Sequence, residues 1–212
     1  MSSPTSPSLT ERRKAATRME IARAAADLFV KQGLRATRAE DIAQAAGIAP
    51  RTFYRYFATK EEAVAPLYAA GAARWTEAVR TAPPDLPIPQ ALEHAAHQTL
   101  TPDAAISAAS WEWVRTLVRL ADSSPALRKV WAEVCHEAET SLAKALAART
   151  PDNVADPAPP LRFAAAVAAA SIRVAVESWA AADAPAPEGP AALALRNLET
   201  LRNFPWADIT HP

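Results

Sequence analysis

Arginine, tyrosine and lysine side chains gather in one short stretch of this sequence, between residues 50 and 60. None of them has the neighbours that a nucleophile or a general base requires, but all of them donate hydrogen bonds to phosphate oxygens or base edges. The stretch therefore favours binding of a polyanion over catalysis. Its candidate residues are Pro50, Arg51, Thr52, Tyr54, Tyr56 and Lys60.

Other arrangements that could do chemistry are incomplete. His94 and His97 lie one helical turn apart, as two metal ligands would, but no Cys and no carboxylate stands at the offset that completes a site. His136-Glu137 begins like a zinc-protease motif, yet Thr140 stands where the second His is required. The single cysteine, Cys135, excludes a disulfide framework. We therefore expect no metal, no cofactor and no enzymatic activity.

The charges of the chain are unevenly distributed. The 23 basic and 23 acidic side chains cancel overall, which by itself argues against a nucleic-acid binder. Residues 1–60, however, carry 11 basic and 5 acidic side chains, a net charge of +6, and residues 61–212 carry a net charge of −6. This asymmetry predicts a head that binds a polyanion, joined to an acidic body with another task.

The composition predicts an all-α fold. Half of the 212 residues are hydrophobic, mostly Ala and Leu, which lose little freedom in a helix, and no strand-like alternation is present. Met1–Ser8 has no basic or apolar stretch and is not a signal peptide. The apolar run Phe163–Val176 is too short to span a bilayer. We expect a soluble, cytoplasmic protein that does not bind a membrane.

Caps delimit most of the expected helices. The first should run from about residue 9 or 11 to residue 32, where Gly33 can take the left-handed conformation. Thr59–Glu62 has the form of a capping box that opens another helix, kinked at Pro66 and running to about residue 80. Further helices are expected at about 90–100, 104–122, 125–148, 160–182 and 190–203.

Two short helices joined by a glycine turn lie between the first helix and that later one. Thr37–Glu40 has the spacing of a capping box and opens a helix to Ala46, Gly47 makes the turn, and Pro50 suits the first position of the next helix. This is the layout of a helix-turn-helix, whose second helix enters the major groove of DNA.

The layout divides the expected DNA contacts into two groups. The start of the second helix would read base edges, through Pro50, Arg51, Thr52 and Tyr56. Phosphate contacts are expected from Tyr54 and Lys60, and the start of the preceding helix adds Thr37 and Arg38 to the predicted set. Phe53 and Phe57 should be core residues that pin the helix. Two interpretations, a solvated face or a phosphate or minor-groove contact, stay open for Arg12, Arg13, Lys14 and Arg18.

The run Ala36–Glu61 resembles the DNA-binding signature of the TetR family of transcription regulators. The resemblance is strong over about residues 15–65. It rests on the Gly47 turn, on Thr52-Phe53-Tyr54 and Tyr56-Phe57, and on the closing Lys60-Glu61. Two departures are mild: Ala49 stands where the family often has a Ser cap, and Pro50 stands at a position that is often polar.

The resemblance implies a helical body that encloses a small-molecule pocket, and a homodimer formed mainly through the last two helices. We expect an apolar cavity walled by Trp113, Trp131 and Phe163, with Arg115 at its polar end, and a hydrophobic small-molecule ligand. The small-residue run Ala164–Ser171 would form the dimer seam together with leucines of the last helix, Leu195, Leu198 and Leu201.

The predicted organisation has three parts: a disordered tail over residues 1–9, a helix-turn-helix domain over 10–58 and a ligand-binding and dimerisation domain over 59–212. The predicted function is a ligand-responsive repressor that a hydrophobic molecule releases from a palindromic operator on double-stranded DNA. An all-helical small-molecule-binding protein or enzyme with an incidental helix-turn-helix is the alternative. An activator or nucleoid-type binder also stays open.

Overall fold

The computed structural model describes residues 8–101, 108–150, 156–183, 189–199 and 201–202. Over these residues the protein consists of nine α-helices and one short 3-10 helix without strands, which confirms the predicted all-α fold. The chain divides into two compact units between Tyr68 and Ala69. The first unit contains the helix-turn-helix, and the second contains the helices of the C-terminal body.

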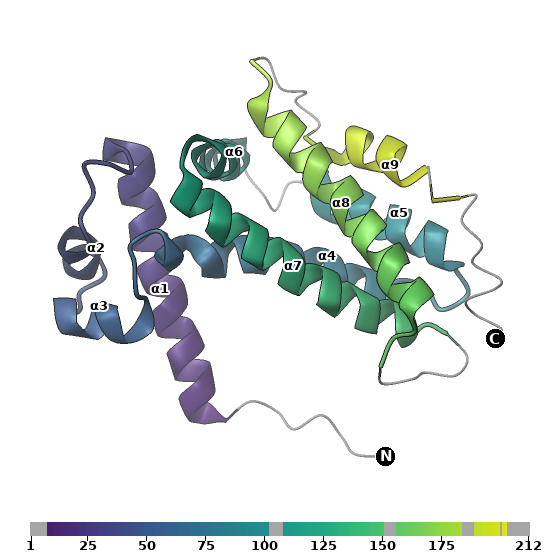
Figure 1. Cartoon of the computed structure of the whole chain (residues 1–212), viewed down its shortest axis with the longest axis horizontal. Coiled ribbons are helices and arrows are strands. Elements are labelled where there is room, and N and C mark those ends of the chain that lie inside the picture. The colour runs from purple at the N-terminus through teal and green to yellow at the C-terminus, as the bar shows by residue number, and fades with distance from the viewer. Residues whose placement is uncertain (1–7, 102–107, 151–155, 184–188, 200, 203–212) are drawn as a thin grey trace. The chain divides into compact units, whose positions relative to one another are not determined.

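The first unit is built on α1 (Leu9–Gln32), which ends where the sequence predicts. In Figure 1, α2 (Ala39–Ala45) lies beside α1 and α3 (Pro50–Tyr56) lies beside α2. The 3-10 helix η1 (Glu62–Val64) returns to pack on α1. Apolar side chains at helical spacing form the core of this unit and are fully buried, among them Ile21, Ala25, Phe29, Ile42 and Phe53.

Two caps at the ends of α1 are local in origin. Ser8 Oγ accepts the N–H of Glu11, and the Glu11 carboxylate accepts the N–H of Ser8, which completes a capping box. Gly33 ends the helix with φ +85° and ψ 156°. This is not the left-handed helical conformation that we predicted, but it is a region that is essentially restricted to glycine.

The predicted capping box Thr37–Glu40 is wrong. The second helix begins only at Ala39, and the Asp41 carboxylate accepts the N–H of Arg38 at 2.9 Å. Thr37 is fully buried, and its hydroxyl donates to the carbonyl of Gly33 at 2.9 Å. The oxygen of this hydroxyl accepts from Gln32 Nε2 at 3.3 Å, so both hydrogen bonds of the Thr37 hydroxyl go to residues before α2.

The helix α4 (Ala65–Thr81) carries the chain from the first unit into the second. Pro66 lies in its first turn, where a missing N–H removes no intrahelical hydrogen bond, so the expected kink is not imposed. The first unit extends past the predicted domain boundary at residue 58 because η1 packs on α1 and buries Ala63 and Val64.

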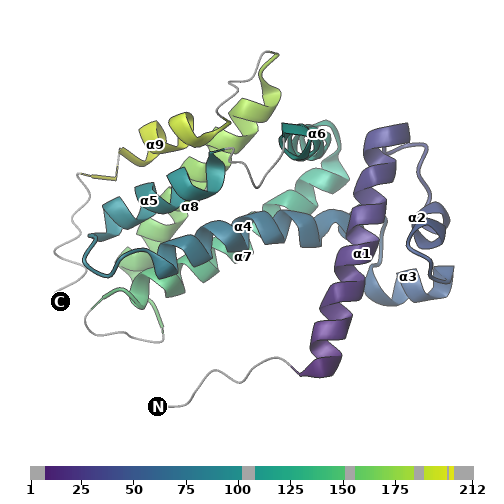
Figure 2. The same ribbon diagram turned by 180° about the vertical axis from the view of Figure 1, so that it is seen from behind.

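In the second unit, α8 (Pro159–Ala181) packs against α7 (Pro125–Ala147), α9 (Ala191–Glu199) and α6 (Ala108–Ser123). The helix α5 (Ile88–Leu100) packs against α9, as Figures 1 and 2 show from opposite sides. Aliphatic side chains from α4, α5, α7, α8 and α9 share one core, which includes Val79, Leu92, Leu142, Leu146, Leu161, Ala168 and Leu198.

Several residues assigned to the dimer seam lie inside this core, whereas Val167, Ala170 and Leu195 are half-buried. Leu198 and Leu201 are buried, and the run Ala164–Ser171 turns Ala165 and Ala168 into the same cluster. The cause is α5, which packs onto the apolar face of α9 and leaves that face unavailable to a second copy.

One side of α8, its open side, exposes apolar side chains. Phe163 and Val174 are 60% and 43% exposed there, and the half-buried Val167 and Ala170 lie between them at helical spacing, with Val167 also packed against the core. Among the described helices α8 alone is long and apolar enough to cross a membrane, but a core helix of a soluble protein meets the same criterion. Its packing against α7 and α9 is that of a core helix with one open side.

Candidate DNA-binding surface and ligand-domain sites

The helix α3 has one buried side and one exposed side. Phe53 and Phe57, one turn apart, are both buried with ring centroids 5.8 Å from each other, which confirms that they are core residues. Arg51, Tyr54 and Arg55 are exposed on the other sides of the helix. Burial of the two rings therefore fixes which side chains α3 presents to the outside.

The two tyrosines of α3 differ in their surroundings. Tyr54 is 53% exposed, and its hydroxyl donates to the Glu40 carboxylate of α2 at 3.4 Å. Tyr56 is half-buried, with the Arg55 guanidinium 5.5 Å from its ring centroid. Tyr54 is thus an exposed residue with a long hydrogen bond to α2, whereas the ring of Tyr56 lies under a cation.

Arg18 of α1 holds the end of α3. Its Nη1 donates to the carbonyl of Tyr56 at 3.0 Å, and its guanidinium lies 4.5 Å from the centre of the Phe57 ring. A cation at a helix C-terminus satisfies a carbonyl that has no intrahelical partner and complements the helix dipole. Arg18 therefore orients α3 from within the unit.

The structure gives structural roles to two predicted DNA contacts. Lys60 Nζ donates to the carbonyls of Leu34 at 2.7 Å and Thr37 at 2.8 Å, so its ammonium ties the loop before α2 to the segment after α3. The Thr37 side chain is fully buried and cannot offer its hydroxyl to DNA. The two hydrogen bonds of Lys60 join residues that are 26 and 23 positions apart in the chain, so no local sequence pattern reveals them.

The remaining predicted contacts lie at the surface, and one residue is added to them. Arg38, Pro50 and Arg51 are exposed, and Thr52 is half-buried. Arg55, which we did not predict, is exposed one turn after Arg51 on the same side of α3. The spacing i, i+4 on a helix whose opposite side is aromatic was the signal that could have identified it.

Arg115 is a buried cation of α6 that contacts the end of α8. It is 8% exposed, its Nε donates to the carbonyl of Ala180 at 3.2 Å, and its Nη2 donates to the carbonyl of Ala182. These carbonyls end α8, so the guanidinium caps that helix. All three guanidinium nitrogens of Arg115 thus have an acceptor within the protein, and its contact with an acidic group on a ligand stays a prediction.

The predicted aromatic walls differ in their surroundings. Phe163 is on the open side of α8 and is 60% exposed, so it is not an internal wall. Trp131 of α7 donates its indole N–H to Glu177 at 2.7 Å, and Arg173 donates to the same carboxylate at 3.0 Å. Trp113 of α6 is half-buried.

Cys135 is an inert thiol in this arrangement. It lies on α7, one turn after Trp131, and is half-buried. Burial raises the pKa of its thiol to about 12. Because the thiolate is the nucleophilic form, the thiol stays protonated and unreactive near neutral pH.

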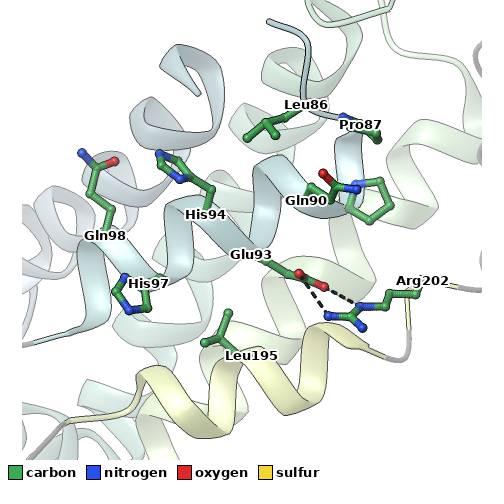
Figure 3. Close-up of a pocket in the computed structure, with 10 residues that line it drawn as sticks. Leu86, Pro87, Gln90, Glu93, His94, His97, Gln98, Leu195 and Arg202 are labelled. Carbon is green, nitrogen blue, oxygen red and sulfur yellow. Dashed lines mark hydrogen bonds and ion pairs between the residues drawn. The ribbon is translucent and has the colours of Figure 1, made fainter. Parts of the chain in front are cut away.

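A groove of about 1080 Å³ lies on α5 and α9 (Figure 3). His94 and His97 line it from successive turns of α5, next to the apolar side chains of Leu86 and Leu195. Glu93 does not complete a metal site with the histidines, because its carboxylate accepts from Arg202 Nε at 2.9 Å. The groove is open, and the histidines on it are exposed.

Comparisons with known proteins match both units. Residues 21–65 match the family model of bacterial regulatory proteins of the tetR family, and residues 86–200 match the MftR C-terminal domain. The HTH-type transcriptional regulator TcmR of Streptomyces glaucescens is 33% identical over 181 residues, which cover 84% of this chain and 79% of that protein.

Two solved structures share the fold at lower identity. One is FadR of Thermus thermophilus, a TetR family repressor in complex with lauroyl-CoA, with 24% identity, a TM-score of 0.58 and coverage of 87% of this chain and 92% of that one. The other is AlkX of Dietzia sp., with 19% identity, a TM-score of 0.60 and coverage of 90% and 98%.

The fold, the exposed face of α3 and these matches define a helix-turn-helix protein that binds DNA and regulates transcription. The chain belongs to the TetR family of bacterial regulators. Regulators of this family act as dimers and are typically not enzymes, so the alternative of an enzyme or carrier with an incidental helix-turn-helix is not favoured.

Proposed function

We propose that this protein is a cytoplasmic repressor that binds a palindromic operator as a homodimer and leaves it when a hydrophobic small molecule binds. The observation that carries the DNA-binding part is the outer side of α3, where Arg51, Tyr54 and Arg55 are exposed above the buried Phe53. A helix anchored on one side with cations on the other suits insertion into the major groove.

Each exposed residue has a distinct role in this proposal. Arg51, at the start of α3, donates to base edges and contributes to sequence preference, supported by packing from Pro50 and by Thr52 and Tyr56. Tyr54 donates to a backbone phosphate once its weak hydrogen bond to Glu40 is exchanged. Arg38 at the start of α2 reaches an adjacent phosphate.

The open side of α8 supports the homodimer. The exposed side chains of Phe163 and Val174, with Ala170 between them, form an apolar stripe that can pack against the same stripe of a second copy. Such a contact is isologous, and a two-fold axis through it gives two identical heads, which read a palindrome.

The ligand part of the proposal rests on the second unit. It is an aliphatic helical body, and the related fold of FadR is known with lauroyl-CoA bound. We propose a hydrophobic ligand of the acyl thioester or apolar acid class, with Trp113 and Trp131 as the aromatic residues to monitor. To release DNA, the ligand must bind more tightly to the conformation that does not fit the operator.

DNase I footprinting of DNA next to its own gene tests the operator. We expect a protected palindrome, and gel shifts at fixed salt should show weaker and less selective binding after Arg51→Ala, by about 1–3 kcal/mol. Arg23→Ala, an exposed cation elsewhere on α1, is the control and should bind as the unmodified protein does. Protection without any repeated half-site, or equal selectivity after Arg51→Ala, contradicts the proposal.

A titration with a medium-chain acyl thioester tests the ligand. Tryptophan fluorescence should change over the same concentration range in which the labelled operator is released. A fluorescence change that leaves operator affinity unaltered contradicts the release mechanism.

A further inference from the structure

A second positively charged surface lies on the first unit, beside α3. Four residues of α1 at helical spacing face the last turn of α3 across a groove of about 370 Å³. The α1 side consists of Thr10, Arg13, Lys14 and Thr17, and α3 contributes Arg55 and Tyr56.

The groove carries three cations and no carboxylate among its lining residues. The acidic side chain of this helix turn, Glu11, is engaged by the N–H of Ser8 in the capping box. Thr10, which also lines the groove, lies in the first turn of α1, where the helix dipole adds positive potential. An anion in the groove would therefore meet attraction from three side chains and from the helix end.

The wall that α3 contributes is held in place. Arg18 of α1 donates to the carbonyl of Tyr56 and lies over the Phe57 ring, while the Arg55 guanidinium lies beside the Tyr56 ring. The spacing between α1 and the end of α3 is thus set by buried and half-buried contacts rather than by the exposed cations. A site with this property needs little reorganisation when an anion binds.

We propose that this groove binds a phosphate of the DNA backbone next to the bases that α3 reads. This inference rests on the proposed operator binding and extends it to α1. Arg55 carries it, because it lines the groove and also lies one turn after Arg51 on the outer side of α3. A duplex that docks on Arg51 would therefore bring one of its own backbone phosphates to the groove. A free anion in the groove would have no such connection to the bases that Arg51 contacts.

The contact sets the register of α3 and carries no sequence information. Phosphate contacts position a protein on the duplex, whereas base contacts specify the site. Loss of the groove cations should therefore weaken binding to all duplexes equally, unlike loss of Arg51.

The salt dependence of DNA binding tests the groove. Operator affinity is measured by fluorescence anisotropy over a series of salt concentrations for the full chain and for Arg13→Ala/Lys14→Ala. Each lost phosphate contact lowers the slope of log K against log salt by about 0.9. We expect a decrease of about 1 to 2, with proportional losses on the operator and on a scrambled duplex.

The control is Arg23→Ala/Lys31→Ala, which removes two exposed cations of α1 outside the groove. An unchanged slope after Arg13→Ala/Lys14→Ala, or an equal decrease in the control, overturns the groove assignment while operator binding stands. A further measurement adds inorganic phosphate as a competitor of DNA. Equal competition in the full chain and in Arg13→Ala/Lys14→Ala also overturns the groove assignment. If the full chain binds no duplex, the proposed function itself fails.

Discussion

Lys60 and Arg18 are cations of the DNA-binding unit whose charged groups point to backbone carbonyls. Lys60 bridges Leu34 and Thr37, and Arg18 holds Tyr56. Hydrogen bonds from charged donors are stronger than neutral ones, and a half-buried carbonyl that loses its donor is left without a partner. These residues therefore contribute to DNA binding by positioning α2 and α3.

Lys60→Met should lower the free energy of unfolding of the first unit by about 1–3 kcal/mol, because two carbonyls lose a charged donor. Urea unfolding followed by circular dichroism measures this, with Lys31→Met, an exposed lysine of α1, as the control. The salt slope of DNA binding should change little. Normal stability combined with a slope lowered by about 1 would instead show that Lys60 contacts a phosphate.

At the scale of elements, α4 is the connection between the two units. Its C-terminal end is held by Arg149 of the α7–α8 connection, whose guanidinium donates to the carbonyls of Val79, Ala82, Pro83 and Leu86. Near the other end, Gly71 lies in the helix interior just after the boundary between the units. A Cβ atom on Gly71 would meet nothing within 4 Å.

Gly71→Ala should stabilise the protein by about 0.5–1 kcal/mol, because alanine removes the conformational entropy of glycine from a helix interior without a clash. Thermal and urea unfolding measure the change. Ala73→Gly, at an exposed position of the same helix, should lower stability by a similar amount. A loss of stability in Gly71→Ala would show that a close neighbour, absent from the described contacts, occupies that side of α4.

At the scale of the whole molecule, the proposed homodimer depends on the exposed apolar side chains on the open side of α8. Burying an apolar stripe against its symmetric copy removes it from water, which is the main favourable term in association. Leu198 of α9 and Leu201 just after it cannot contribute in this way, because both are in the core of their own protomer.

Val174→Glu should convert the homodimer into a monomer at micromolar concentration, since two buried carboxylates would face each other across the two-fold axis. Light scattering measures the mass, and circular dichroism checks that the fold is kept. Val114→Glu on α6 is the matched control, because Val114 is 38% exposed and lies outside the stripe. A dimer that survives Val174→Glu would place the interface elsewhere. Leu198→Glu, by contrast, should unfold the second unit.

The sequence by itself determined the fold class, most helix bounds, the helix-turn-helix and the family. These follow from signals that lie close together in the chain: the periodicity of Ile21, Ala25 and Phe29, the proline at the start of α3, and the Gly47 turn. Such signals are read within a few residues, so tertiary packing does not alter them.

The tertiary structure decided where the charged groups act and which apolar faces stay open. Lys60 and Arg115 look like ligand-binding cations in the sequence, yet their acceptors are carbonyls 23 to 67 residues away. Leu198 of α9 was expected at the dimer seam, but it is buried in the core to which α5 and α9 both contribute. A long charged side chain donates hydrogen bonds to carbonyls that lack another partner, and an apolar helix face packs against a neighbouring helix. Both choices depend on packing between distant segments, which only the folded chain brings together.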